Sequence, residues 1–115
     1  MSHPRSRLDG VIHAPVRLSI VAALAAVDSA EFKFVRETVE ISDSALSKQV
    51  STLEEAGYVR VRKSFAGRRP RTHLSLTPEG RAAFDRHVRA LHDIASGATL
   101  PDPVPDGGEG AAGPA

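Results

Sequence analysis

Six basic residues lie close together between Arg60 and Arg71, and no acidic residue lies among them. They are Arg60, Arg62, Lys63, Arg68, Arg69 and Arg71. The planar guanidinium group matches the geometry of phosphate oxygens, and a cluster this dense attracts polyanions. The net charge of the 115-residue chain is only +1, because acidic residues (Asp102, Asp106 and Glu109) lie in a tail without Lys or Arg. The local clustering, rather than the net charge, therefore indicates a polyanionic partner.

The basic residues lie on an expected β-hairpin that follows a helix. The helix is expected from Ser42 or Asp43, either of which can cap its first N–H groups, and it ends before Gly57. Alternating apolar and basic residues predict a strand over 58–65, and Leu74 and Leu76 share one face of a returning strand over 71–76. Residues 66–70 form the turn. The sequence therefore predicts a short basic hairpin directly after an amphipathic helix.

Three further helices complete the expected domain. The first spans about 14–28 and the second about 31–39, while Thr77-Pro78-Glu79 is a strong helix start for a last helix reaching residue 95. The chain is thus expected to be mainly α with a small β-hairpin (α+β), in the order α-α-α-β-β-α. We expect a flexible N-terminal arm over 1–13, one domain over 14–95, and a disordered acidic tail rich in Gly, Pro and Ala over 96–115.

The helix before the hairpin has two sides. Leu46, Val50 and Leu53 form its apolar stripe. The opposite side is small and hydroxylic near its start, with one cation, and acidic only at its end. Its candidate DNA-contacting residues are Ser42, Ser44, Ser47, Lys48, Ser51 and Thr52. Such a face suits a helix that enters a major groove with its N-terminus first. The simpler alternative is a surface helix with solvated polar residues.

The hairpin residues are assigned by their position along it. Arg68 and Arg69 lie at the tip and are expected to enter a minor groove or bind phosphates. Lys63 and Arg71 lie at its shoulders and are expected to face the flank of a duplex. The remaining pair, Arg60 and Arg62, is interpreted more simply as a solvated strand face that pairs with Glu54 or Glu55.

The stretch from Leu46 to Phe84 resembles the winged-helix transcriptional regulators of bacteria, in the broad MarR/ArsR-like group. The matching positions are Leu46, Ser47, Val50, Leu53, Glu54, Gly57, Tyr58, Val59, Leu76, Thr77 and Gly80. The resemblance covers about residues 12–95. It implies a winged helix-turn-helix, with the recognition helix at 42–56 and the wing at 65–71. It also implies a homodimer that binds double-stranded DNA at a pseudo-palindromic operator, usually as a repressor.

Longer members of this group have extra helices, which build a dimer interface and often an effector pocket. This chain offers only its N-terminal segment, first helix and last helix, so the sequence leaves a small-molecule effector open. The apolar residues Phe84, Val88 and Leu91 recur along the last helix, and a core this small cannot bury them all. We therefore expect them to form the dimer interface. The alternative is that Phe84 and Val88 cap the core of a monomer.

Other function classes find little support. The chain has no Cys, and His87 and His92 are five residues apart, so they do not form a one-turn pair for a metal. No phosphate-binding glycine loop or nucleophile–base pair can be placed, so we expect no enzyme and no cofactor. No membrane span or signal peptide is expected, which makes a cytoplasmic location the default.

A winged-helix protein-interaction module is the main alternative, although the basic wing argues against it. RNA binding is weaker still, because aromatic residues are few.

Overall fold

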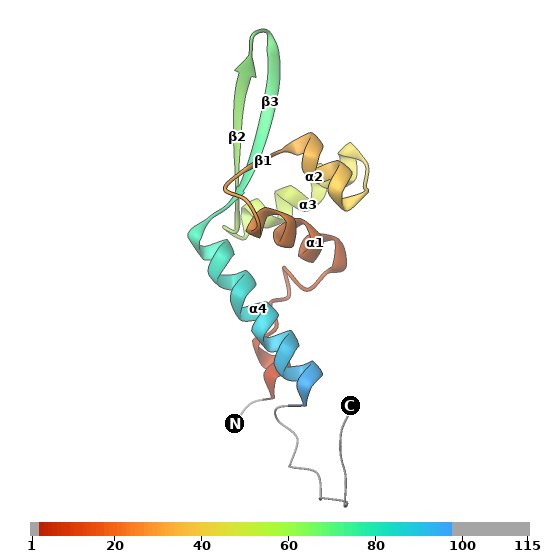
Figure 1. Ribbon diagram of the computed structural model, residues 1–115, viewed down its shortest axis with the longest axis vertical. Coiled ribbons are helices and arrows are strands. Elements are labelled where there is room, and N and C mark those ends of the chain that lie inside the picture. Colours follow the sequence, from red (N-terminus) through yellow and green to blue (C-terminus); the bar gives the residue numbers. More distant parts are fainter. Residues whose placement is uncertain (1–2, 98–115) are drawn as a thin grey trace, which may run out of the picture.

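The computed structural model describes residues 3–97, which form a winged helix-turn-helix (Figure 1). Its elements are η1 (Pro4–Arg7), α1 (Pro15–Ala25), β1 (Ala30–Glu31), α2 (Phe32–Val39), α3 (Asp43–Glu55), β2 (Val59–Ala66), β3 (Arg69–Leu76) and α4 (Pro78–Ser96). The expected α+β class is confirmed, as is the order of three helices, a hairpin and a last helix. The short elements η1 and β1 are additional. The tail that we expected to be disordered lies, from residue 98 onward, outside the described residues.

Strand β3 is the centre of a three-stranded antiparallel sheet in the order β1-β3-β2. Val59 pairs with Leu76 at the root of the hairpin, and Ala66 pairs with Arg69 at its tip. On its other edge β3 pairs with β1, where Ala30 lies opposite Leu74. Figure 1 shows the β2–β3 hairpin as a long ribbon that projects away from the helices. This hairpin is the wing.

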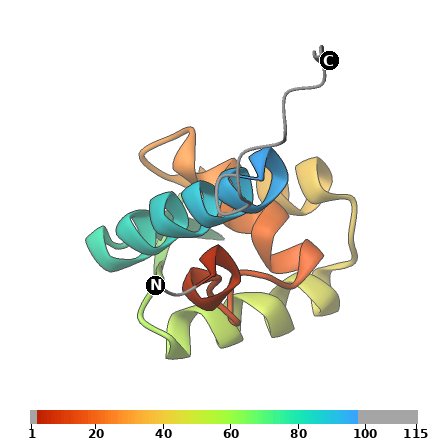
Figure 2. The same ribbon diagram turned by 90° about the horizontal axis from the view of Figure 1, so that it is seen from below.

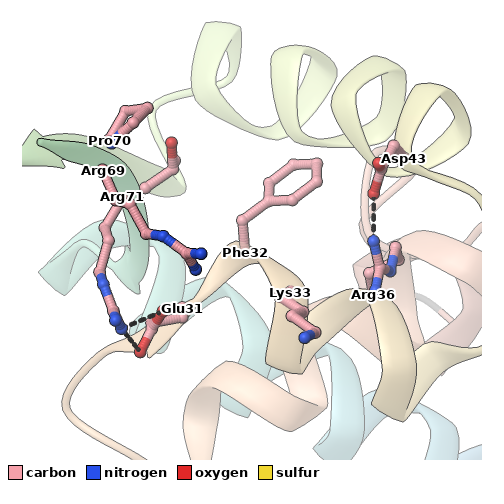
Figure 3. A pocket seen from close by; sticks show the side chains of 9 residues that line it. Glu31, Phe32, Lys33, Arg36, Asp43, Arg69, Pro70 and Arg71 are labelled. Atoms are coloured by element: carbon pink, nitrogen blue, oxygen red, sulfur yellow. Dashed lines mark hydrogen bonds and ion pairs between the residues drawn. The ribbon is translucent and has the colours of Figure 1, made fainter.

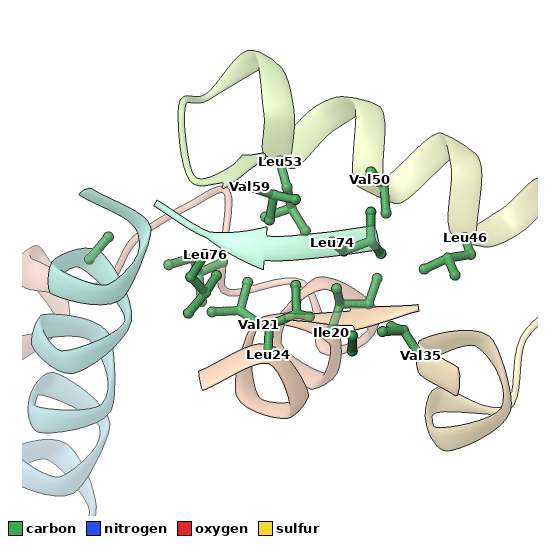
Figure 4. Close-up of a cluster of buried hydrophobic side chains, with 13 residues drawn as sticks. Ile20, Val21, Leu24, Val35, Leu46, Val50, Leu53, Val59, Leu74 and Leu76 are labelled. Atoms are coloured by element: carbon green, nitrogen blue, oxygen red, sulfur yellow. The ribbon is translucent and has the colours of Figure 1, made fainter. Parts of the chain in front are cut away.

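The core lies between α3 on one side of the sheet root and α1 on the other (Figure 4). The expected apolar stripe of α3 is buried: Leu46 and Leu53 are fully covered and Val50 nearly so. Leu74 of β3 lies between these side chains and those of α1, whose contribution is Ile20, Val21 and Leu24. The packing therefore fixes the orientation of α3 relative to the wing, with its polar side outward.

Helix α4 begins at the root of the wing. The Thr77 side chain caps it by accepting a hydrogen bond from the Gly80 N–H (2.9 Å), and its hydroxyl donates to the Gly57 carbonyl oxygen (2.6 Å). A Cβ at Gly80 would overlap the carbonyl oxygen of Tyr58, so only glycine allows α4 to approach this closely. From here α4 runs away from the wing, toward the opposite end of the molecule (Figure 1).

The N-terminal segment is part of the folded unit, which corrects the expectation of a flexible arm. Pro4 and Ile12 are buried, and Figure 2 shows η1 beside α4. Arg7 forms an ion pair with Asp93 of α4 at 2.9 Å. The main-chain N–H of Asp9 donates to Nδ1 of His87, also on α4, at 2.9 Å. These contacts join residues far apart in the sequence, and no local pattern reveals them.

Candidate nucleic-acid interface

The outward side of α3 carries the residues expected to face DNA. Ser44, Ser47, Lys48 and Ser51 are all exposed. In the part of the chain that the structure describes, Lys48 forms no ion pair and the hydroxyls of Ser47 and Ser51 form no hydrogen bond. The backbone of α3 can approach another surface closely here, because three of the four side chains are small.

Three of the candidate residues of the recognition helix already have structural partners, and two of them, Ser42 and Ser44, share a hydrogen bond between their hydroxyls at 3.3 Å. The Ser42 hydroxyl accepts a hydrogen bond from the Ala45 N–H (3.1 Å), so Ser42 is the N-cap of α3. Thr52 is half-buried, and its hydroxyl donates to the Lys48 carbonyl oxygen. Gln49 accepts a hydrogen bond from Arg17 of α1. It therefore faces the body of the protein.

An acid at the start of α3 corrects the expectation that this side is acidic only at its end. Asp43 is an exposed residue in the first turn of the helix. Arg36 of α2 donates to its carboxylate at 2.7 Å, and this hydrogen bond raises the pKa of Arg36 (Figure 3). The ion pair offsets a negative charge that would otherwise repel a phosphate at this end of the helix.

The two faces of the wing differ. Strand alternation places Val59, Val61, Lys63 and Phe65 on the face toward α3, and Arg60, Arg62, Arg69 and Arg71 on the other face. At the tip, Gly67 and Arg68 form a two-residue turn in which Gly67 has φ +65°. Gly67 supplies the positive φ that a tight hairpin turn needs at this position. The turn leaves Arg68 exposed at the end of the molecule.

The arginines of the wing are not equally available. Arg71 binds Glu31 of β1 through both carboxylate oxygens, at 2.9 and 3.0 Å (Figure 3). By contrast, Arg68 and Arg69 form no ion pair with any residue between 3 and 97. The expected pairing of Arg60 and Arg62 with Glu54 or Glu55 is wrong, because neither arginine forms an ion pair with any residue between 3 and 97. These two arginines project from the wing face that points away from α3, beside Asp28, Ser29 and His73.

A groove joins the wing to α3. Ser47 and Ser51 of α3 line one wall, Lys63 and Thr72 of the wing line the other, and Phe32 of α2 also lines the groove. Its volume is about 640 Å³. Phe32 also lines a second hollow, which reaches Lys33, Arg36 and the shoulder of the wing (Figure 3). Phe32 and Lys33 carried no separate signal in the sequence, since their place beside the wing depends on the pairing of β1 with β3.

Helix α4 has one covered face and one open face. The covered face lies beneath the N-terminal segment and the sheet root. Its buried residues are the small residues Gly80, Ala83 and Ala90, together with His87. The neighbouring stripe is the one expected at a dimer interface. Phe84 and Leu91 are half-buried and Val88 is 42% exposed. Phe84 packs partly against the core, whereas Val88 does not.

A polar cluster lies beneath this covered face. Asp9 accepts a 2.6 Å hydrogen bond from the Tyr58 hydroxyl, which raises the pKa of Tyr58. Burial alone would raise the pKa of Asp9, but the combined hydrogen bonds from Tyr58 and two main-chain N–H groups lower it. Burial and the nearby His13 lower the pKa of His87. Since Nδ1 of His87 accepts a hydrogen bond from the Asp9 N–H, the ring proton lies on Nε2, which is buried without a hydrogen-bond partner within residues 3–97.

Residues 3–97 contain no group of three or more metal-ligating side chains of the His, Cys, Asp and Glu types. No helix within the same range is long and apolar enough to cross a membrane. The chemistry that these residues do present is a polar helix face and a basic hairpin joined by a groove.

Known proteins are similar to this chain in sequence and in fold. Residues 16–95 match the family described as winged helix DNA-binding domain. An uncharacterized protein of Methanocaldococcus jannaschii, MJ0432, is 31% identical over 78 residues, which cover 68% of this chain and 85% of that protein. A transcriptional regulator homologue from Pyrococcus horikoshii has a TM-score of 0.77 at 26% identity, covering 87% of this chain and all of that one. A MarR-family regulator of Enterococcus faecalis, described as putative, has a TM-score of 0.67 at 23% identity, covering 77% and 80%. The chain belongs to the winged-helix DNA-binding domain family and has the fold of the MarR-like transcriptional regulators.

Proposed function

We propose that this protein is a sequence-specific regulator of transcription that binds a pseudo-palindromic operator as a homodimer and represses the adjacent gene. One observation carries the proposal: the polar side of α3 and Lys63 of the basic wing line a single groove, and the exposed Arg68 and Arg69 lie at the tip of the same wing. A duplex placed there meets α3 in its major groove and the wing on the neighbouring backbone.

The roles of individual residues follow from their positions. Ser44, Ser47, Lys48 and Ser51 contact base edges and nearby phosphates, since they are exposed on the outward side of α3. Ser42 and Thr52 contribute at the rim, where each already holds a structural hydrogen bond. Arg68 and Arg69 bind the backbone or the minor groove, and Lys63 binds a phosphate across the groove. Arg71 contributes less, because Glu31 already neutralises it.

The open stripe of α4 supports the homodimer. Phe84, Val88 and Leu91 line up at helical spacing on the face that the N-terminal segment leaves uncovered. Pairing two such stripes about a two-fold axis removes this apolar surface from water. It also gives two copies of α3 the symmetry that a pseudo-palindromic operator requires.

Substitutions on α3 test the assignment of base contacts. Replacing Ser47 or Lys48 by Ala is expected to change the preference among related operator sequences, by about 1–3 kcal/mol at the base pair concerned. Competition between labelled and variant duplexes measures this preference. An equal loss of affinity for every sequence would contradict the assignment of α3 as the reading element.

Repression is tested separately with a reporter gene behind the selected operator. Expression is expected to fall when the protein is produced and to recover with the Lys48→Ala variant. Increased expression with the unchanged protein would contradict the repressor role while leaving DNA binding intact.

A further inference from the structure

Phe65 is the most exposed large apolar side chain on residues 3–97. It lies in β2 close to the tip of the wing and is 74% exposed, well above Phe34 at 54%. Its cross-strand neighbour is Pro70, also exposed. The wing thus presents an aromatic ring and a proline side by side, far from the core that buries Val59 and Leu74. Nothing in the described fold requires an apolar pair at this position.

The position of Phe65 on the wing indicates what it meets. It shares a wing face with Lys63, and that face continues into the groove beside α3. Arg68 lies at the adjoining turn, and Arg69 lies on the opposite face. No acidic residue occurs between Glu55 and Glu79. Lys63, Arg68 and Arg69 form no ion pair within residues 3–97. An apolar pair beside these cations suits a surface that combines negative charge with flat apolar rings, which is the chemistry of a nucleic-acid groove.

We propose that Phe65 and Pro70 form a wedge that enters the minor groove beside the operator and partly unstacks one base step. This inference rests on the proposed function. Arg68 and Arg69 hold phosphates on the two sides of the groove while the wedge contacts the bases. Insertion costs least at flexible pyrimidine–purine steps such as TA or CA. The wedge therefore adds a sequence preference outside the bases that α3 reads.

The wedge and the arginines differ in how they respond to salt. A basic side chain that binds a phosphate releases counterions, and this produces a steep dependence of affinity on salt concentration. An apolar side chain releases none. The Phe65→Ala variant is therefore expected to lower the affinity by about tenfold at every salt concentration, without changing the slope of the salt dependence.

The experiment uses the full chain and a duplex obtained by selection from random DNA. 2-Aminopurine replaces single adenines in the sequence flanking each half-site, because its fluorescence rises when it is unstacked. The unchanged protein is expected to raise the emission at one flanking step. Phe65→Ala should abolish this rise, while Phe65→Leu, which keeps an apolar side chain, should retain most of it. Phe34→Ala is the matched control, since it removes another exposed phenyl ring, and it should change neither emission nor affinity.

Thermal unfolding of each variant shows whether it is folded, and the exposure of Phe65 predicts little loss of stability. The wedge is overturned if the unchanged protein binds the duplex without any rise in emission. It is also overturned if Phe65→Ala binds as tightly as the unchanged protein, the result expected if the ring serves a protein partner. Failure of the unchanged protein to bind any duplex would overturn the proposed function as well, so the two failures are distinguishable.

Discussion

The wing tip should supply a large share of the electrostatic binding energy. Arg68 and Arg69 are exposed and form no ion pair between residues 3 and 97. Each is free to bind a phosphate, which releases about 0.9 counterions per contact. A homodimer presents two wings and thus four such arginines. Replacing Arg68 and Arg69 by Ala in both subunits should therefore reduce the slope of log affinity against log salt by about 3–4.

The size of this effect makes it easy to measure. With about three to five phosphate contacts per subunit, the unchanged dimer should show a slope of about −5 to −9. A slope near −7 lowers the affinity by about four powers of ten between 50 and 200 mM salt, while a slope near −3.5 lowers it by about two. Fluorescence anisotropy of a labelled duplex over this range of salt concentrations gives the slope for the unchanged protein and for the variant. All sequences should be weakened alike, because phosphate contacts carry no base preference.

The matched control removes the same charge from the same hairpin. Arg60 and Arg62 project from the wing face that points away from α3, near the root. Replacing both by Ala should change the slope by less than about 1 per subunit. An equal flattening by the two double variants would refute the assignment of the tip, since general charge alone would then explain the effect. A tip variant with an unchanged slope would refute it directly.

Three further predictions concern the parts that hold the interface in place. Gly80→Ala should lower the free energy of unfolding by about 1–3 kcal/mol, because the new methyl group overlaps the carbonyl oxygen of Tyr58. Chemical denaturation measures this loss, and Gly10→Ala, whose methyl group would lie in open space, is the control. Equal stability of the two variants would contradict the close approach of α4 to Tyr58. Val88→Asp should shift sedimentation equilibrium toward monomers at micromolar concentration, and an unchanged dimer would place the interface elsewhere. His87 has a lowered pKa in the folded protein, so the unfolded chain binds a proton more readily, and the stability should fall as the pH falls below about 6.5. His87→Asn should remove that fall between about pH 7 and 5 in thermal unfolding experiments, and a loss of the same size in both proteins would assign the pH dependence to other groups.

Local patterns predicted the parts of the fold that depend on neighbouring residues. Ser42 and Thr77 cap the helices that they were expected to cap, and Gly57 follows α3 with φ +82°. The stripe of α3 and the alternation of the wing strands were also recognisable, because helix and strand periods repeat within a few residues. These features place the polar side of α3 and the tip of the wing without any knowledge of tertiary contacts.

The features that could not be predicted depend on contacts between distant residues. Strand β1 has two residues, too few to show any alternation, and pairs across more than 40 positions with β3. The hydrogen bonds of Asp9 to Tyr58 and His87 likewise join the N-terminus to elements far along the chain. Without them, a segment with Pro4 and Gly10 resembled a free arm. Phe65 was missed for a different reason: its pairing with Pro70 emerges only once the register of the two wing strands is known.

Selection of bound fragments from random duplex DNA by the purified full chain tests the central claim most directly. The account predicts an enriched symmetric motif with two half-sites about one helical turn apart, since two copies of α3 related by a two-fold axis enter successive major grooves. A folded protein that enriches no motif would contradict sequence-specific binding. A single unpaired half-site would contradict the homodimer.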